Sequence, residues 1–199
     1  MLRLALVDDH PAVLAGLRRL IDSEPDLMVA AVRSDAAELA RELEDVRPDV
    51  LILDYDVARH DGLTQCARIK RRPDPPGVII YSAYAGPALT LAARAAQADG
   101  VVDKVAPVPS LLTAIRRVAD GDVVMPAISR DVFESAVARL DDDDLPVLAM
   151  LLDREALGSI ARALGTERAD VRRRAQRIVG RLRPRLAGDS VDLAIEAQQ

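Results

Sequence analysis

Five side chains that can do chemistry each follow a short apolar run. They are Asp8, Asp9, Asp54, Ser82 and Lys104. Three carboxylates held close together repel one another, and Mg²⁺, a hard cation that needs few protein oxygens, relieves that repulsion. A carboxylate can also attack phosphorus, while the metal, a lysine and a serine hydroxyl stabilise the transferred group. Asp54 follows its run alone and suits attack, whereas the adjacent pair Asp8 and Asp9 suits the metal. These residue types therefore indicate phosphoryl transfer to a carboxylate.

Such side chains need a fold that gathers the ends of its strands. The first 120 residues alternate runs of strand length with patterns of helical spacing. The expected strands are Leu2–Val7, Leu27–Val32, Val50–Leu53, Val78–Tyr81 and Gly100–Val102. The expected helices are Val13–Ile21, Ala36–Leu43, Leu63–Lys70, Pro87–Gln97 and Ser110–Ala119, the last capped by Ser110. This alternation predicts an α/β fold, a doubly wound five-stranded parallel sheet with its site at the carboxyl ends of the strands.

The composition indicates how the core is built and in which cellular compartment the protein is expected. Half of the 199 residues are apolar and only 2% are aromatic, so the core must be built from aliphatic side chains. The single cysteine, Cys66, lies in an apolar run of helical spacing, and we expect a small buried side chain there. One cysteine allows no internal disulfide, and the first acid, Asp8, comes too early for a signal peptide. No apolar stretch approaches the roughly 18 residues of a membrane span. We therefore expect a cytoplasmic protein without a membrane partner.

The net charge of −5 conceals a basic end. Residues 145–187 contain ten Arg, no Lys and four acids, a net of +6, which leaves −11 for the rest of the chain. This contrast predicts two domains with different partners. The expected helices of the basic end are Leu145–Leu152, Ala156–Leu164, which Gly165 ends, and Glu167–Leu182, which Thr166 caps.

The last of these helices carries arginines along its outer face. They are Arg168, Arg172, Arg173, Arg174, Arg177 and Arg181. A basic helix after a short turn with glycine is typical of a recognition helix in the major groove of double-stranded DNA. The alternative is a three-helix bundle whose arginines are only solvated or bind protein.

Residues 120–144 connect the acidic and basic parts. A helix is expected at about Ser129–Leu140, and the four acids Asp141–Asp144 are expected to form a solvated cap or linker. The predicted organisation is one domain at 1–119, a linker with a helix at 120–144, a helix-turn-helix domain at 145–187 and a tail at 188–199.

Five short motifs carry a family resemblance. They are Val7-Asp8-Asp9-His10-Pro11, Leu53-Asp54, Asp61-Gly62, Tyr81-Ser82-Ala83-Tyr84 and Asp103-Lys104. Together they resemble the receiver domain of NarL/FixJ-type response regulators, over about Leu2 to Ala119. The resemblance implies the flavodoxin-like strand order 2-1-3-4-5 and phosphorylation by a sensor histidine kinase.

The resemblance also implies roles for single residues. Asp54 matches the phospho-acceptor, Ser82 the switch hydroxyl and Lys104 the lysine of the family pattern. The implied Mg²⁺ site consists of Asp8, Asp9 as the more direct ligand, Asp54, and the backbone carbonyl of Asp56.

Two departures concern the phosphorylation switch. The family usually has Pro four residues after the acceptor and Tyr or Phe three before the lysine, but these positions are Ala58 and Val101 here. Without that ring, phosphorylation chemistry can persist while its route to the output is left open. Tyr84 either replaces the ring in part or is a loop residue at the pocket mouth. His10 is expected to be a loop or capping residue.

The basic end resembles the LuxR-type output domain. Ser159–Gly165 and Val171–Leu182 carry the likeness, while Leu140–Leu145 replaces the family's opening Thr and Glu pattern, and Arg172 and Arg174 replace the usual Lys and His. The expected protein is a non-enzymatic regulator that binds DNA as a homodimer. Its expected DNA contacts are Arg168, Arg172, Arg173, Arg174 and Arg177. The alternatives are a receiver-fold adaptor that contacts proteins and a DNA-binding regulator that does not need phosphorylation.

Overall fold

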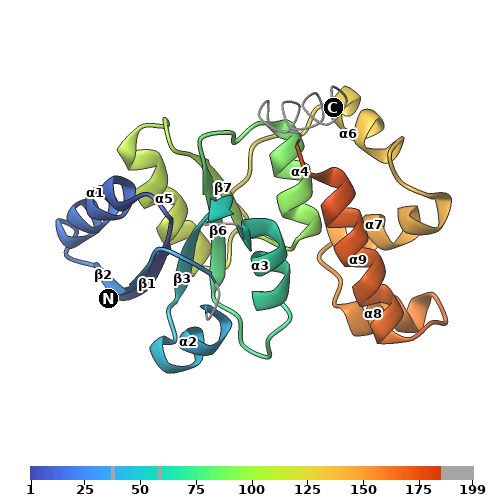
Figure 1. The fold of residues 1–199 in the computed structure, drawn as a ribbon, viewed down its shortest axis with the longest axis horizontal. Helices are drawn as coiled ribbons and strands as arrows, with labels where there is room; N and C mark the ends of the chain where they lie inside the picture. The colour runs from blue at the N-terminus through green and yellow to red at the C-terminus, as the bar shows by residue number, and fades with distance from the viewer. Residues whose placement is uncertain (37–38, 58–59, 185–199) are drawn as a thin grey trace, which may run out of the picture.

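The computed structural model describes residues 1–36, 39–57 and 60–184, and shows an α/β body joined to a group of helices (Figure 1). The strands are β1 (Leu2–Val7), β2 (Leu27–Arg33), β3 (Val50–Asp54), β4 (Asp56–Val57), β5 (His60–Asp61), β6 (Gly77–Ser82) and β7 (Gly100–Asp103). The helices of the body are α1 (Pro11–Asp22), α2 (Leu39–Val46), α3 (Gly62–Ile69), α4 (Pro87–Ala95) and α5 (Val108–Ala119). The later helices are α6 (Arg130–Val137), the 3₁₀ turn η1 (Asp142–Asp144), α7 (Leu145–Leu152), α8 (Leu157–Ala163) and α9 (Arg168–Leu182). Within the described residues, no helix is both long enough and apolar enough to cross a membrane.

Five strands form one parallel sheet in the order β2-β1-β3-β6-β7. With β6 and β7 as the fourth and fifth strands of that sheet, this is the predicted order 2-1-3-4-5, and the prediction is confirmed. The register keeps the strand ends level, since Val7 pairs with Leu53, and Asp54 pairs with Tyr81. Residues that follow β1, β3 and β6 therefore leave the sheet at the same edge.

Two apolar layers lie on the faces of the sheet. α1 and α5 cover one face, and α2, α3 and α4 cover the other (Figure 1). Successive strand residues serve opposite layers, because Leu51 belongs to the α2–α4 side and Ile52 to the α1–α5 side, both fully buried. Burying a side chain of this size contributes about 1.5–3 kcal/mol. Burial on both faces explains why these strands are apolar throughout rather than alternating.

Cys66 lies inside the α2–α4 layer, as expected. Its side chain is buried, and its thiol donates a hydrogen bond to the carbonyl oxygen of Ala96, 3.5 Å away. Burial raises the pKa of the Cys66 thiol far above its ordinary value. The reactive thiolate is therefore suppressed, which fits a packing role.

The later helices pack against the α3–α4 side of the body. α9 lies beside α4 and α3, while α6 and α7 contact α4 (Figure 1). One apolar cluster runs from the body into α9, where it includes Ile178 and Val179. A polar contact reinforces it, because Arg154 pairs with the buried Asp99, whose other carboxylate oxygen lies 2.8 Å from Nζ of Lys70.

Two expected helix caps are wrong. Pro107 rather than Ser110 precedes α5, and Glu167 rather than Thr166 precedes α9. Because proline fits the first turn of a helix, α5 begins earlier than expected. The backbone N–H of Thr166 instead donates to the carbonyl oxygen of Ala161 at 3.0 Å, which closes the end of α8.

The acid run Asp141–Asp144 is not solvated throughout. Asp144 ends η1 and is fully buried. Arg177 of α9 donates two hydrogen bonds to its carboxylate, at 2.6 and 3.2 Å. The expectation of a solvated cap or linker is therefore wrong for Asp144, because a cation from a later helix neutralises it.

Candidate functional site

Buried acidic and polar side chains gather where β1, β3 and β6 end. Asp8, Asp54 and Ser82 are all buried at this edge. Lys104, which follows β7, reaches the same place, with its Nζ 2.6 Å from Oδ2 of Asp8 and 3.0 Å from Oδ2 of Asp54. The parallel topology thus brings together side chains from four strands, as the sequence predicts.

The charges in this pocket shift its proton equilibria. Burial raises the pKa of Asp54, and the Asp8 carboxylate adds to that rise, although the hydrogen bond from Lys104 opposes it. Burial would lower the pKa of Lys104, but its hydrogen bonds to Asp8 and Asp54 outweigh burial and raise it. Lys104 therefore stays protonated at neutral pH. One cation faces two buried carboxylates, and the excess negative charge favours a second cation.

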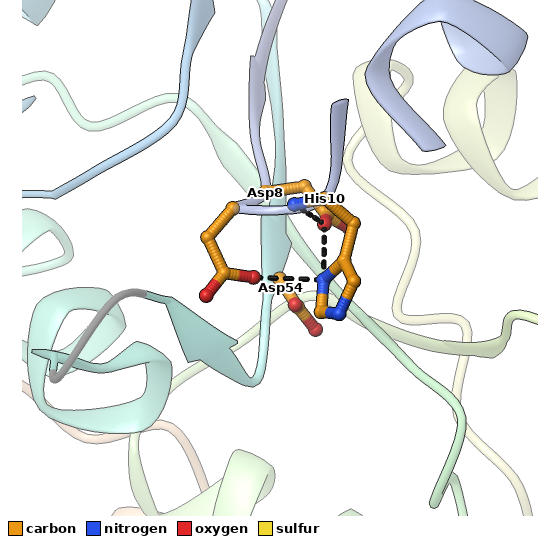
Figure 2. A group of neighbouring side chains, drawn as sticks. Asp8, His10 and Asp54 are labelled. Atoms are coloured by element: carbon orange, nitrogen blue, oxygen red, sulfur yellow. Dashed lines mark hydrogen bonds and ion pairs between the residues drawn. The ribbon is translucent and has the colours of Figure 1, made fainter. Parts of the chain in front are cut away.

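His10 lies inside this acidic group. Its Nδ1 is 3.2 Å from Oδ1 of Asp8, and its backbone N–H donates to the same oxygen at 2.9 Å (Figure 2). The same Nδ1 is 2.7 Å from Oδ1 of Asp9. His10 precedes α1 at the capping position, as expected, but its side chain makes no capping hydrogen bond. The sequence feature that indicates this position is that His10 directly follows the acidic pair Asp8 and Asp9.

The donor atoms of this group fit a hard cation. Asp8, Asp9, His10 and Asp54 each offer a ligand atom, and these atoms lie within 4.8 Å of one another. Carboxylate oxygens are ligands that Mg²⁺ prefers, and a small protein set leaves positions for water and a phosphoryl oxygen. Asp56 lies in β4 with an exposed side chain. Its expected contribution is a backbone carbonyl, and that stays a prediction.

Three residues near Ser82 bear on the missing ring. Its Oγ accepts a hydrogen bond from the backbone N–H of Tyr84 at 3.1 Å, but the Tyr84 side chain is 62% exposed and lies in the loop. Val101 is buried in β7, where it offers no ring to move. Tyr81, to which the sequence analysis assigns no role in the pocket, has its ring centroid 5.8 Å from Nζ of Lys104, within range of a cation–π contact. Its place one residue before Ser82 was the available signal.

The segment after Asp54 contains two short strands that pair as a hairpin. β4 and β5 pair antiparallel, with Asp56 opposite Asp61, while Ala58 lies outside the described residues. Gly62 follows directly, and a Cβ there would overlap the carbonyl oxygen of Asp54. A glycine is therefore required for α3 to begin this close to Asp54.

Asp61 connects this hairpin to two helices. Its carboxylate caps α3 by accepting from the backbone N–H groups of Leu63 (3.2 Å) and Thr64 (2.8 Å). The same carboxylate pairs with Arg183, which directly follows α9. A segment seven residues beyond Asp54 thus touches the end of the arginine-rich helix.

Three arginines of α9 face the acid run. The pairs are Arg174 with the carbonyl oxygen of Asp143 (2.9 Å), Arg177 with Asp144 (2.6 Å) and Arg181 with Asp141 (2.8 Å). The sequence reading placed all three on a free outer face, which is wrong because residues 141–144 fold back onto it. A role of Arg174 and Arg177 in DNA binding stays a prediction.

The remaining arginines of α9 are placed differently. Arg173 pairs with Asp170 of its own helix. Arg168 and Arg172 have no hydrogen bond or ion pair to other residues that the structure describes, and both border Arg71 of the body. Arg168, Arg172 and Arg173 are exposed.

Comparison with known proteins identifies the family of the α/β body. Residues 4–116 match the family of the response regulator receiver domain, more than half of the chain. The chain therefore belongs to the receiver-domain response regulators. Its similarity to the nitrate/nitrite response regulator NarL of Escherichia coli, 26% identical over 60% of this chain and 56% of NarL, supports the NarL/FixJ type predicted from the motifs.

Two solved structures extend the comparison. A LuxR-family two-component response regulator from Aurantimonas is 32% identical with a TM-score of 0.61, covering 69% of this chain and 99% of that one. RcsB from Salmonella enterica, described as bound to the promoter rprA, is 22% identical with a TM-score of 0.56 over 98% and 96% of the two chains, which shows the fold alone.

The curated relatives are longer than the matched region. The chain spans about half the length of relatives such as NarL. Protein-glutamate methylesterases also match, over no more than 30% of their own length, and that enzymatic name is a statement about those proteins.

Proposed function

We propose that this chain is a response regulator of a two-component system. A sensor histidine kinase phosphorylates Asp54, and the chain regulates transcription as a homodimer through sequence-specific DNA binding. The observation that carries the proposal is the buried Asp54 carboxylate, 3.0 Å from the Lys104 ammonium and beside Asp8 and Asp9. The proposed units are the receiver at 1–119, the linker at 120–144 and the DNA-binding domain at 145–187; residues 185–187 and the tail at 188–199 lie outside the described residues.

Asp54 acts as the nucleophile of the proposed transfer. One carboxylate oxygen forms the new P–O bond while the P–N bond of the kinase phosphohistidine breaks, and the imidazole nitrogen keeps the electron pair. Lys104 stays protonated and donates to the oxygens of the transferred group. The Ser82 hydroxyl then donates to a phosphoryl oxygen. Mg²⁺, held by Asp8, Asp9 and Asp54, would offset the negative charge of the phosphoryl group.

Acetyl phosphate tests this half directly. With Mg²⁺ present, we expect the wild type to gain one phosphoryl group, measured by intact mass and by retardation in a phosphate-binding gel. Asp54→Asn should gain none. The exposed Asp74 supplies the matched control, and Asp74→Asn should be labelled like the wild type. An unlabelled wild type, or a labelled Asp54→Asn, contradicts the proposal and favours a regulator that does not use phosphorylation.

The DNA-binding half depends on α8, α9 and the turn between them. Gly165 has φ +61 in that turn, a left-handed conformation that glycine adopts without strain. Exposed arginines on the following helix supply positive charge for phosphates and guanine edges. Arg168 and Arg172 border Arg71 of the receiver, so a duplex reaches them fully only when α9 and α3 separate. We propose that phosphorylation favours this separation.

Binding to DNA selected from a genomic library tests this half. We expect salt-dependent binding by fluorescence anisotropy, and a loss of about tenfold for Arg172→Ala, since one phosphate or base contact contributes about 1–3 kcal/mol. Arg139, exposed on the segment after α6, supplies the control, and Arg139→Ala should bind like the wild type. Absence of DNA binding with and without acetyl phosphate contradicts this half and favours the adaptor alternative.

A further inference from the structure

Four arginines without acidic partners gather where the receiver meets α9. Arg68 lies near the end of α3 and Arg71 just after it, while Arg168 and Arg172 lie on the first two turns of α9. Across the described ranges, none of the four has a hydrogen bond or an ion pair to an acid. Burial lowers the pKa of Arg71, and the charges of Arg172 and Arg68 lower it further. This group is therefore an uncompensated positive cluster shared by two domains.

A cavity opens between these arginines. Arg71, Arg168 and Arg172 line a hollow of about 360 Å³ together with Leu157 and Ala169. Its charge is not balanced as it is on the α9 face that contacts the acid run, where Arg174, Arg177 and Arg181 each have a partner. The hollow therefore presents guanidinium groups that are free to bind a ligand.

A second hollow of about 290 Å³ adjoins the first and shares Arg71, Leu157 and Arg168 with it. Its apolar lining is made of small and aliphatic side chains. They include Ala67, Ala96, Leu151, Ala156 and Val179. Among the described residues that line this hollow, one is acidic, namely Glu155, and its side chain is exposed. A ligand with an anionic end and an apolar end fits these two adjoining hollows.

The packing of α9 on the receiver brings the positive charges of Arg71 and Arg172 close together, and their repulsion opposes that packing. Guanidinium groups bind phosphoryl oxygens in a bidentate fork, and such charge-assisted hydrogen bonds are about twice as strong as neutral ones. A phosphoryl group in the first hollow offsets the repulsion between Arg71 and Arg172. It also bridges the receiver to α9, because its partners come from both.

We propose that a small phosphoryl-bearing anion binds between Arg71, Arg168 and Arg172 and holds α9 against the receiver. The phosphoryl group belongs either to an inorganic polyphosphate or to a nucleotide whose base enters the second hollow. Because Arg168 and Arg172 are also candidate DNA contacts, the anion competes with DNA. This last step rests on the proposed DNA-binding function, whereas binding of the anion does not.

Calorimetry on the full chain tests the site, with inorganic pyrophosphate and ADP as probes at constant ionic strength and without divalent cations. We expect saturable binding that weakens at least tenfold in Arg71→Gln. Arg139→Gln removes the same charge from an arginine outside the hollows and should bind like the wild type. Tighter binding of ADP identifies a nucleotide, and equal or tighter binding of pyrophosphate identifies an inorganic anion.

Two controls keep this test decisive. Arg71→Lys retains the charge but loses the planar fork, so its affinity should fall between those of Arg71→Gln and the wild type. Far-UV circular dichroism should show that both variants are folded. No binding to the wild type, or equal binding to the wild type and Arg71→Gln, overturns the proposal.

DNA competition separates this proposal from the proposed function. The better probe should weaken DNA binding of the wild type at least fivefold and have less effect on Arg71→Gln. If no DNA binds under any condition, the proposed function fails while the calorimetric result still decides the anion site. If DNA binds but neither probe competes through Arg71, the anion proposal fails and the proposed function stands.

Discussion

The acidic pocket at the ends of β1 and β3 and the arginines of α9 are two clusters of like charge. Their counter-charges come from residues at different distances along the sequence. The pocket receives its counter-charge from Lys104, which lies 96 residues from Asp8 in the sequence and reaches it only through the sheet topology. Part of α9 receives its counter-charge from a segment nearer in the sequence, since Asp144 lies 33 residues from Arg177. In the pocket one cation is shared between two buried carboxylates, and on α9 the cations are divided into paired and unpaired sets. The pocket thus retains a deficit of positive charge, and the domain contact retains a surplus.

The paired and unpaired arginines should separate in stability. Among the described residues, Arg177→Ala leaves the fully buried Asp144 carboxylate with Arg181 at 3.7 Å as its one cation. We expect a loss of about 3 kcal/mol, the low end for a broken buried pair because Arg177 is 42% exposed. Arg172→Ala removes no partner and should change stability by less than about 0.5 kcal/mol. Urea unfolding monitored by circular dichroism measures both. Equal losses in the two variants would show that the division of α9 is wrong.

Addition of Mg²⁺ should offset the deficit of positive charge in the acidic pocket and so stabilise the folded protein. At a concentration 100 times its Kd, a ligand of the folded state stabilises it by about 2.7 kcal/mol. We expect Mg²⁺ to stabilise the wild type accordingly, and Asp9→Asn to lose most of that gain because Asp9 belongs to the ligand group. Thermal unfolding at constant ionic strength provides the measurement, with Asp74→Asn as control. A full gain in Asp9→Asn would remove Asp9 from the metal site.

Arg183 should link the two clusters. Its ion pair with Asp61 joins the hairpin after Asp54 to the end of α9, which supplies a contact between the receiver and α9 where Val101 offers no ring. In Arg183→Ala we expect the effect of acetyl phosphate on DNA affinity to fall about fivefold, equivalent to about 1 kcal/mol of coupling. Anisotropy titrations of phosphorylated and unphosphorylated protein measure this. Unchanged coupling with normal labelling of Asp54 would assign communication to another contact.

The smallest effect concerns the pH dependence of stability. Because burial raises the pKa of Asp54 above its ordinary 3.8, the folded state favours the protonated carboxyl, so the contribution is greatest at acid pH and is lost as pH rises through the folded pKa. Without divalent cations, Asp54→Asn should therefore be more stable than the wild type at pH 7, by about 0.5 kcal/mol or about 1–2 °C in Tm. The gain should vanish near pH 3. A destabilised Asp54→Asn at pH 7 would mean that the Lys104 hydrogen bond outweighs burial.

The sequence predicts the sheet and the pocket because both follow from local pattern plus one topological rule. Apolar runs mark the strands, and the parallel order then brings Asp8, Asp54 and Lys104 together. The sequence does not predict the partners of the α9 arginines, because helical spacing defines a face of the helix but not the segment that covers it. The return of Asp144 onto that face depends on tertiary packing. The place of Arg71 beside Arg172 likewise depends on how the domains dock, which no local pattern encodes.

The buried thiol of Cys66 offers a chemical measure of motion at that docking surface. Cys66 belongs to α3, and its buried thiol contacts the carbonyl oxygen of Ala96 at the end of α4, so a maleimide reaches Sγ only after α3 has moved away from its neighbours. With a single cysteine in the chain, one alkylation rate reports one opening reaction, and its ratio to the rate of a free thiol gives the free energy of that opening. The helix in question begins at the Asp61 cap and leads into Arg71. Alkylation kinetics with and without phosphorylation would therefore report, from inside the core, whether events at the sheet edge loosen the surface that holds α9.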